Sequence, residues 1–437
     1  MAFIVPLLVS CSLDSPKLGK VSVDKVVAAM TLEEKANIVI GSGMEGFTGD
    51  EAVIGTTLSL VPGAAGTTYA IPRLGIPAIA LADGPAGLRI NPTREGDCDT
   101  YYCTHFPIGT LLASTWNQEL VEKVGAAIGN EALEYGVDIL LAPALNIRRH
   151  PLCGRNFEYY SEDPFLSGKM AAAVVRGVQE EGTCGAVIKH FACNNQEDNR
   201  MGVDVHISER ALREIYLRGF EIAVKESAPV AIMTSYNRVN GVHAANSRAL
   251  CTVIAREEWG FDGVLMSDWS TTAPEDGSIP WKCIEAGNDL IMPGSEKDDA
   301  DIRQAYADGR LSEKKIRLCA GRIISLINKL DKKITKVVIG NNIVSIGKNA
   351  FAKCTKLVSV IIGKNVTKIG KDAFAGCKKL KKIVIKTKKL TKKSVAKGAF
   401  RSVGKKVVVQ VPKSEYKAYK KLLRAKGLSK KVKIKRY

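Results

Sequence analysis

Short, almost continuously apolar runs alternate with amphipathic segments through the first three quarters of the chain. Runs of this length, separated by helices, are typical of strands that are buried on both faces of a parallel sheet. The pattern therefore predicts repeated strand–helix units. The predicted strands lie within residues 76–83, 137–146, 185–191, 230–237, 263–269 and 289–294.

The segments between these runs carry apolar residues at three- and four-residue spacing, which is typical of helices. Residues 116–136 and 208–227 show this spacing most clearly. In residues 30–40, Thr31 is followed three positions later by Glu34, and this pair predicts a capping box at the start of a helix.

Several of the apolar runs end in polar residues. In an eight-stranded α/β barrel the carboxyl ends of all strands meet on one face, where such barrels keep their chemistry. Residues 24–330 have the length of one barrel with some insertion. A doubly wound open sheet is the main competitor, but no G-x-G-x-x-G follows the first strand. We expect an α/β fold, a (β/α)8 TIM-like barrel.

Residues 331–437 have a different pattern, which repeats. Four pairs of like residues are 23 positions apart: Gly340 and Gly363, Gly347 and Gly370, Phe351 and Phe374, Cys354 and Cys377. This period is within the range of leucine-rich repeats. A third, degenerate copy passes through Phe400. We expect a short C-terminal leucine-rich-repeat solenoid.

The net charge of +19 is concentrated in these repeats. Residues 331–437 hold 33 Lys and Arg against 3 Asp and Glu, whereas the rest of the chain holds 31 against 42. The lysines fall between apolar positions, so a solvated face of the solenoid is favoured. Nucleic acid is disfavoured because few aromatic residues are available for stacking. A cell-wall polyanion or a protein remains as a partner for the repeats.

The composition narrows the class of protein and the kinds of site that are expected. Apolar residues make up 46% and charged residues 25%, which is ordinary for a globular protein. The absence of any run of eighteen apolar residues predicts no transmembrane segment. Eleven cysteines without a C-x-x-C pair and five histidines without H-x-x-x-H spacing predict neither a disulfide scaffold nor a metal site. No phosphate-cradling loop occurs, so we expect no cofactor.

Residues 1–23 are interpreted as a leader or linker. The apolar start ends in Leu8-Val9-Ser10-Cys11, which resembles a lipoprotein cleavage site, but no basic residues precede it. A signal sequence and a clipped or mis-started N-terminus both stay open. The signal would favour an extracellular or cell-surface location, with the cytoplasm as the alternative.

The predicted barrel mouth has the character of a sugar site. Carboxylates and cations can bind hydroxyls, and an aromatic face can pack against a pyranose ring. Plainer roles stay open: an Asp at a strand end often caps a helix, Lys189 could pair with a structural carboxylate, and Arg155 could form only a salt bridge with Glu158. The candidates are Asp83, Arg155, Lys189, His190, Arg200, Tyr236, Asp268 and Trp269.

Six motifs, in order, carry a specific resemblance: "LADGPAGLR", "GRNFEYYSEDP", "KHFACNNQEDNR", "SERALREIYL", "MTSYNRVNG" and "GVLMSDW". Over residues 24–330 the chain resembles the catalytic barrel of glycoside hydrolase family 3, in its β-glucosidase branch. Residues 331–437 resemble the BspA-like leucine-rich repeats of bacterial cell-surface proteins.

The resemblance implies a retaining β-glycosidase that acts on a β-linked glucoside or a related oligosaccharide. Asp268 matches the family's nucleophile, which forms a glycosyl ester that water later opens. Tyr236 is expected to hold the pKa of this carboxyl low by donating a hydrogen bond. The other family matches line the sugar subsite: Asp83, Arg155, Lys189, His190, Arg200 and Tyr236.

Retaining hydrolysis also needs an acid about 5–5.5 Å from the nucleophile. In β-glucosidases of the family a Glu from a following α/β sandwich domain supplies it, but here the segment "RLCAGRIISLINKL" runs directly into the repeats. The β-N-acetylglucosaminidase branch uses a His after K-H-F, and this loop has none. Glu197, Asp198 and His206 match no family acid and are expected to be structural.

Three hypotheses follow. The first is a β-glucosidase-like hydrolase whose acid is absent or comes from another chain. The second is a non-catalytic carbohydrate-binding cell-surface protein. The third is a fusion product without a function evolved as a unit.

Overall fold

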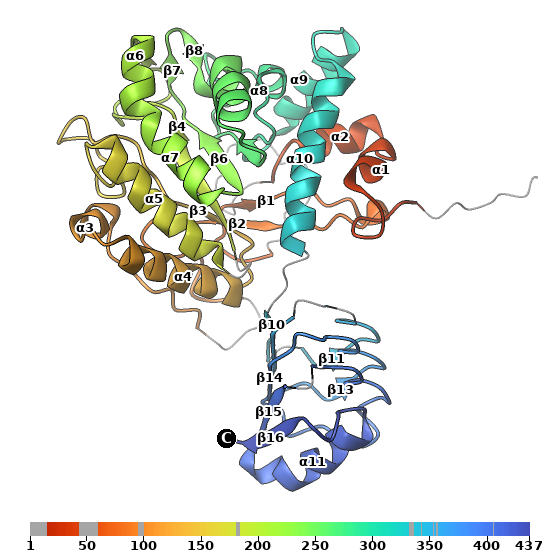
Figure 1. The fold of residues 1–437 in the computed structure, drawn as a ribbon. Coiled ribbons are helices and arrows are strands. Elements are labelled where there is room, and N and C mark those ends of the chain that lie inside the picture. The colour runs from red at the N-terminus through yellow and green to blue at the C-terminus, as the bar shows by residue number, and fades with distance from the viewer. Residues whose placement is uncertain are drawn as a thin grey trace, which may run out of the picture.

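The computed structural model describes residues 15–42, 60–94, 100–180, 184–331, 336–341, 343–352, 354, 357–404 and 406–437. An α/β part and a solenoid follow one another along the chain (Figure 1). The change of architecture falls between a helix that ends at Asp331 and a strand that begins at Lys336. The domain bounds 24–330 and 331–437 stay predictions, and most of the proposed leader, residues 1–14, lies outside the described residues.

The α/β part is built around a six-stranded sheet in the order β1-β2-β3-β4-β6-β9. Strands β2 to β9 pair in parallel, whereas β1 is antiparallel to β2. Five of the six predicted apolar runs contain one of these strands. The strands are β1 (Gly66–Thr67), β2 (Ala80–Asp83), β3 (Ile139–Leu141), β4 (Gly185–Phe191), β6 (Ala231–Thr234) and β9 (Val264–Met266).

Two short segments close this sheet into a barrel. Met266 of β9 pairs with Leu290, Ile291 pairs with Ile40, and Ser42 pairs with Thr67 of β1. The fold class, an α/β barrel, is confirmed by this ring, but the run 289–294 forms bridges and no regular strand. Pro293 follows two residues later and lacks the N–H that a longer ladder would need.

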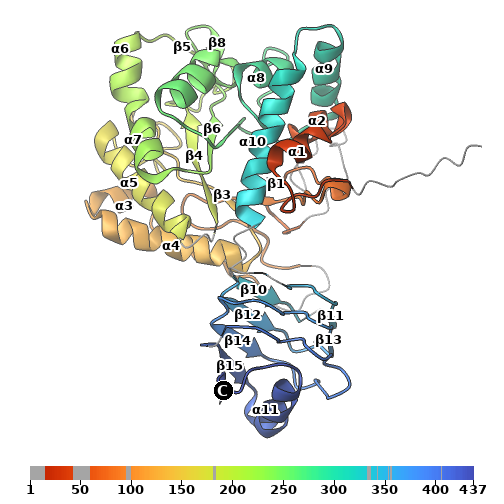
Figure 2. The same ribbon diagram turned by 45° about the vertical axis from the view of Figure 1, so that its right-hand side comes forward.

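Helices surround the barrel (Figure 2). The capping box at Thr31 is present at the start of α2. The predicted helix within 208–227 is interrupted by a π-helical turn at Leu212–Tyr216. The helices are α1 (Val23–Ala28), α2 (Leu32–Ile38), α3 (Gly109–Ser114), α4 (Gln118–Glu134), α5 (Pro164–Val178), α6 (Glu209–Ala211), α7 (Arg218–Ser227), α8 (Pro280–Ala286), α9 (Glu296–Ala307) and α10 (Glu313–Asp331), with a second π-helical segment at Ala249–Glu258.

Strands of the barrel are buried on both faces, as their sequence predicts. Every residue of β4 is buried. Val187 packs into the cluster that holds Leu81 and Met266, whereas Ile188 packs into the cluster that α4, α5 and α7 cover. This double burial holds the strand ends rigidly, which is what a site built at those ends requires.

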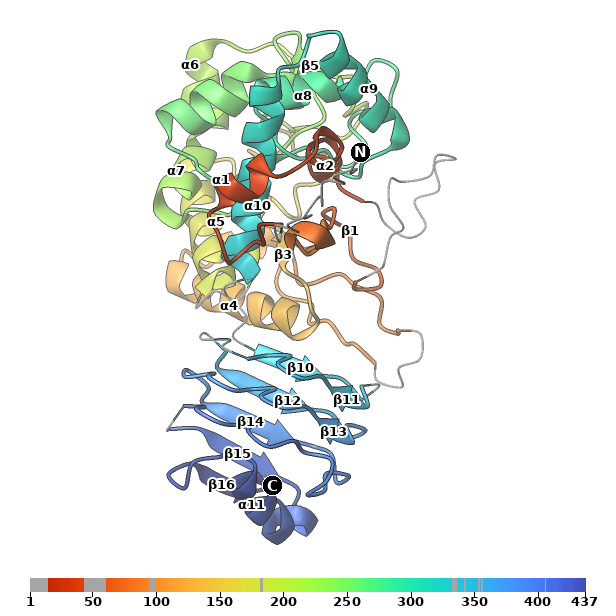
Figure 3. The ribbon, with the colours of Figure 1, turned by 90° about the vertical axis from the view of Figure 1, so that its right-hand side faces the viewer.

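The repeat part is a solenoid with one parallel sheet along its length (Figure 3). The register steps from Lys336 to Ser359 and then to Lys382, the predicted period of 23 residues. The rings of Phe351, Phe374 and Phe400 stack with centroids 5.3 and 5.5 Å apart. The elements are β10 (Lys336–Ile339), β12 (Ser359–Ile362), β14 (Lys382–Ile385), β15 (Val408–Val411) and β16 (Lys433–Arg436), a smaller sheet of β11 (Ser345–Ile346) and β13 (Lys368–Ile369), and α11 (Tyr416–Ala425).

None of the described helices combines the length and apolarity needed to cross a membrane. Within the same residues, no three His, Cys, Asp or Glu side chains gather as a metal site would require. Cys98, a member of the one close cysteine pair in the sequence, lies outside the described residues.

Candidate active site

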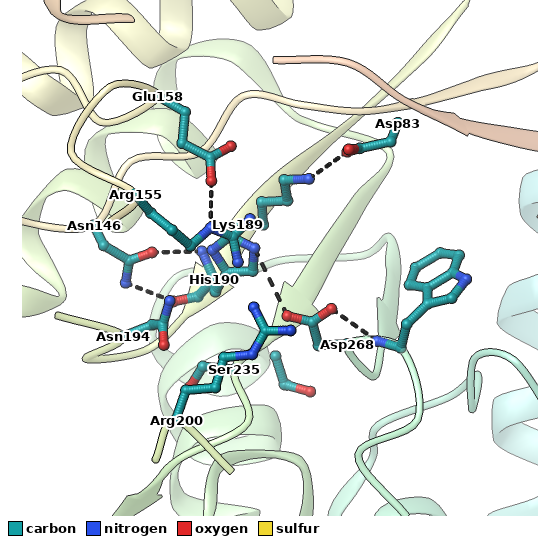
Figure 4. A network of polar contacts seen from close by, with 12 residues as sticks. Asp83, Asn146, Arg155, Glu158, Lys189, His190, Asn194, Arg200, Ser235 and Asp268 are labelled. Atoms are coloured by element: carbon teal, nitrogen blue, oxygen red, sulfur yellow. Dashed lines mark hydrogen bonds and ion pairs between the residues drawn. The ribbon is translucent and has the colours of Figure 1, made fainter. Parts of the chain in front are cut away.

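The carboxyl ends of the barrel strands surround a cavity of about 430 Å³. All eight residues that the sequence analysis selected line it, and Figure 4 shows most of them around Asp268. They come from segments that are far apart in the chain, since Asp83 ends β2 and Asp268 follows β9. That they bind substrate stays a prediction. The other lining residues are Gly63, Ala65, Arg89, Leu141, Met201, Met233 and Ser270.

Asp268 is held by its neighbours in the chain. Ser267 ties the end of β9 to the closing segment, because its N–H donates to the Leu290 carbonyl at 2.8 Å. The Asp268 Oδ1 accepts the Trp269 N–H at 2.7 Å, and the indole N–H of Trp269 donates to the Ala65 carbonyl at 2.8 Å. The second oxygen, Oδ2, is buried and accepts no hydrogen bond of normal geometry from the described residues. The two oxygens of the carboxylate thus differ, since the backbone of Trp269 anchors only Oδ1.

The pKa of Asp268 lies above the ordinary range for an aspartate. Burial raises it, and the cations of Arg155 and Lys189 together with the Trp269 N–H and the Tyr236 hydroxyl lower it by less. The sequence analysis expected Tyr236 to hold this pKa low. That expectation is corrected: Tyr236 acts in the expected direction, but the loss of water around the carboxyl is the larger effect.

His190 faces Asp268, with its Nε2 3.7 Å from the Asp268 Oδ2. Burial lowers the pKa of His190 well below its usual value, and Arg155, Lys189 and Arg200 lower it further. The ring is therefore neutral at pH 7, so its contact with Asp268 is not an ion pair.

Asn146 positions the His190 backbone. Its side-chain amide donates to the His190 carbonyl and its Oδ1 accepts the His190 N–H, both at 2.8 Å. This reciprocal pair acts like one rung of a sheet between two strand ends. Asn146 is the last residue of the predicted run 137–146, although its partner could not be inferred from the pattern.

Asp83 is held by two cations on the other side of the cavity. Lys189 donates to its Oδ1 at 2.7 Å, and the Arg89 guanidinium lies 3.3 Å from its Oδ2. Burial alone would raise the pKa of Asp83, but Lys189 and Arg89 outweigh it and the pKa is lowered. Asp83 is therefore an ionised acceptor. Arg89 was missed by the sequence analysis, although it ends the "LADGPAGLR" motif.

Two arginines complete the polar wall. The Arg155 Nε donates to the buried Glu158 carboxylate (Figure 4). Arg200 donates to Glu197 at 2.9 Å and lies over the Tyr236 ring, 4.6 Å from its centroid. Lys189 and Arg155 therefore do form the ion pairs with carboxylates that the sequence analysis gave as their plainer roles. Because these pairs line the cavity, structural pairing and sugar binding are compatible.

The in-chain candidates for an acid lie outside this cavity. Glu197 is bound by Arg200 and by the Asn194 amide at 3.0 Å, Asp198 is exposed, and His206 is an exposed side chain 3.4 Å from Asp204. Among the described residues that line the cavity, Asp83 and Asp268 are the carboxylates.

A second hollow of about 400 Å³ adjoins the first. It shares Asp83, Arg89 and Arg155 with the main cavity and continues along His105 and the half-exposed ring of Phe157. The cavity around Asp268 is therefore continued on the side of Asp83, with room for more than one small ring.

Two family matches divide the chain at the same place as its architecture. Residues 61–326 match the Glycosyl hydrolase family 3 N terminal domain, and residues 329–431 match six copies of the BspA type Leucine rich repeat region. The chain belongs to glycosyl hydrolase family 3. The family and the repeat type are those that the motifs and the 23-residue period predicted.

The chain is similar to β-glucosidases and to an arabinopyranosidase. The chain is 42% identical to Thermostable beta-glucosidase B of Acetivibrio thermocellus over 311 residues, which is 70% of this chain and 38% of that protein. It is also 42% identical to the Exo-alpha-(1->6)-L-arabinopyranosidase of Bifidobacterium breve over 307 residues, 69% of this chain and 37% of that protein.

Solved structures agree. Beta-glucosidase 3B from Thermotoga neapolitana, in complex with alpha-D-glucose, matches 70% of this chain and 42% of its own, with 52% identity and a TM-score of 0.65. The chain thus spans less than half the length of each of these relatives. Its similarity covers the barrel and not the rest of those proteins.

Proposed function

We propose that this chain is a retaining β-glycosidase of the β-glucosidase type, in which Asp268 is the nucleophile and the surrounding cavity binds the sugar. The observation that carries the proposal is the state of Asp268. One carboxylate oxygen is anchored by a backbone N–H, and the carboxyl is buried beside the Tyr236 hydroxyl, Lys189, Arg155 and a neutral histidine.

In the proposed reaction, the Asp268 Oδ2 attacks the anomeric carbon while the bond to the leaving oxygen breaks. A glycosyl ester forms, and water then opens it to release the sugar. The ionised Asp83 accepts hydrogen bonds from hydroxyls at the far end of the ring, and Lys189 and His190 donate to a neighbouring one. Trp269 presents its face to the ring. These contacts orient the substrate and tighten as charge develops on the sugar.

Neither carboxylate of the cavity suits the role of the general acid. A general acid needs a raised pKa, whereas Lys189 and Arg89 lower the pKa of Asp83. Asp268 is already the nucleophile. The described lining therefore offers no carboxylic acid, and we infer that the proton comes from a group outside it, on this protein or on another molecule.

This inference predicts a dependence on the leaving group. A dinitrophenolate departs without protonation, whereas an alkoxide does not. We expect 2,4-dinitrophenyl β-D-glucoside to be cleaved and methyl β-D-glucoside to survive. Added azide should speed the release of the sugar, because it attacks the ester without a base. Methyl glucoside cleavage at a similar rate would show instead that an acid is present in the chain.

Trapping identifies the nucleophile directly. The 2-deoxy-2-fluoro analogue of the activated glucoside should add one fluoroglucosyl mass to the peptide that contains Asp268. Asp268→Ala should lower the cleavage rate by at least about 10³-fold. Asp262→Asn, an exposed carboxyl just before β9, is the matched control and should keep the activity. A label on another residue would overturn the assignment.

That the described lining offers no carboxylic acid also supports a second candidate, a sugar-binding protein without turnover. Calorimetry that detects glucose binding, together with intact dinitrophenyl glucoside, would select it. The identity of the sugar can be tested in the same assays by comparing β-glucosides with α-L-arabinopyranosides, since relatives with both names are similar to this chain.

A further inference from the structure

An open groove of about 1010 Å³ lies on the solenoid, far along the chain from the barrel cavity. It follows the exposed face and the carboxyl ends of adjacent parallel strands, from the turn after β12 across β14 and β15 to the residue after β16. Figure 3 shows these strands stacked side by side. A groove that crosses several strands suits an extended ligand more than a compact one.

Six lysines, here called the lysine rim, line this groove. All six are exposed, and no ion pair among the described residues involves them. One of them, Lys389, donates to the Asn365 side chain at 2.9 Å. The acidic side chain Asp372 of the repeats is bound by Arg401 at 2.7 Å. Positive charge thus gathers along the rim, and no described ion pair neutralises it. Its members are Lys364, Lys382, Lys386, Lys388, Lys389 and Lys413.

The groove is not lined by lysine alone. The lining also includes Val384, Gln410, Pro412 and the half-exposed ring of Tyr437. Small apolar surfaces and one aromatic ring can pack against the C–H face of a sugar ring, and the amide groups of Gln410 and Asn365 can bind hydroxyls. One aromatic ring is too few for a row of stacked bases.

The spacing of the strands and the type of cation in the rim both suit an extended sugar chain that carries carboxylates. Neighbouring strands lie about 4.7–4.9 Å apart, which is close to the length of one sugar unit in an extended chain. Lys364 follows β12, Lys386 follows β14 and Lys413 follows β15, so rim lysines beside neighbouring strands can meet carboxylates on nearby sugars. Lysine is a compact point charge that needs no fixed bidentate geometry. Such a rim matches a flexible, repeating line of carboxylates.

We propose that the groove with the lysine rim binds an acidic polysaccharide, one whose sugars carry carboxylates, and so holds the barrel on a polymeric carbohydrate. The groove is a separate site, and its occupation does not depend on Asp268. The benefit of holding the barrel there rests on the proposed glycosidase function, whereas the binding itself does not.

Polygalacturonate is the probe, and its fully methyl-esterified form is the uncharged comparison with the same sugar chain. The full-length chain should bind polygalacturonate in calorimetry or affinity electrophoresis, and the esterified form at least about tenfold more weakly. Binding should weaken as salt rises from 50 to about 500 mM, because exposed charges are screened. Single-stranded DNA and polyaspartate test for polyanions that are not polysaccharides.

The triple variant Lys386→Gln, Lys388→Gln, Lys389→Gln should weaken polygalacturonate binding about tenfold. The matched control is Lys392→Gln, Lys393→Gln, Lys397→Gln, which removes the same charge from exposed lysines outside the groove. It should change binding by less than about twofold. Both variants should keep the wild-type CD spectrum and cleave the activated glucoside as before.

Several results would overturn the proposal. Equal losses in the two triple variants would mean diffuse charge attraction with no groove. Equal or tighter binding of DNA or polyaspartate would assign the groove to another polyanion, and no binding of polygalacturonate would reject it outright. Asp268→Ala should bind polygalacturonate like wild type, so a failure of the glycosidase proposal would leave this test intact.

Discussion

The cations of the barrel cavity and those of the lysine rim differ in solvent exposure and in ion pairing. Lys189 is 4% exposed and is paired with Asp83 at 2.7 Å, whereas the rim lysines are exposed and no described ion pair involves them. A buried charge without a partner costs several kcal/mol, while an exposed one keeps its water. The barrel must therefore pair its charges to fold, and the solenoid can leave its charges available to a partner.

The largest effect should come from unpairing a buried charge in the barrel. Asp289 is fully buried and accepts from Arg256 at 2.5 Å and Arg322 at 2.9 Å. We expect Asp289→Ala to lower the free energy of unfolding by ~3–5 kcal/mol. Urea unfolding followed by tryptophan fluorescence measures it, because all four tryptophans lie in the barrel part.

The matched change in the solenoid is Asp372→Ala, which removes the partner of the exposed Arg401. It should lower the stability of the repeats far less than Asp289→Ala lowers that of the barrel, because water screens an exposed ion pair, and circular dichroism of the repeats measures the change. Similar losses from the two substitutions would break the contrast between paired and solvated charge.

A pH experiment tests what the buried Lys189 does in the cavity. Burial raises the pKa of Asp268, and the Lys189 cation lowers it by less. Lys189→Met should raise that pKa further, so the acid limb of kcat/KM for dinitrophenyl glucoside should move to higher pH, since only the ionised nucleophile reacts. Lys392→Met, an exposed lysine of the repeats, should leave the limb in place.

A smaller effect is expected from Asp268→Asn on stability. The pKa of Asp268 is raised in the folded state, so its ionised form destabilises the fold above that pKa, and the penalty disappears at pH values below the unfolded pKa. The neutral amide should therefore raise the urea midpoint at pH 7 and give no gain near pH 3. A gain that stays constant with pH would contradict the burial argument.

The smallest effect concerns salt. Repulsion among the lysines of the repeats should be screened as salt rises, and the repeats should gain ~1 kcal/mol or less between low and high NaCl. Circular dichroism follows the repeats, and tryptophan fluorescence follows the barrel, whose paired charges should respond less. An equal response of both parts would show that unpaired charge is not what distinguishes them.

Much of the fold could be predicted from the local sequence pattern. Thr31 and Glu34 form their capping box, and the 23-residue step from Phe351 to Phe374 is kept as a ring stack, because both depend on near neighbours or on a repeat. The run 289–294 was predicted as a strand and forms only bridges. Its backbone hydrogen-bond partners, which lie in residues 39–41 and 265–270, were set by closure of the barrel and not by its own pattern.

The sequence by itself determined the family, the α/β alternation, the repeat period and the residue types at the cavity, because motifs and spacing are properties of short stretches of chain. Only the tertiary structure decided that Arg89 shares Asp83 with Lys189, that Asn146 holds His190, and that burial outweighs Tyr236 at Asp268. These outcomes depend on distances between residues far apart in the chain and on the water that packing removes. The local sequence pattern specifies neither the distances nor the burial.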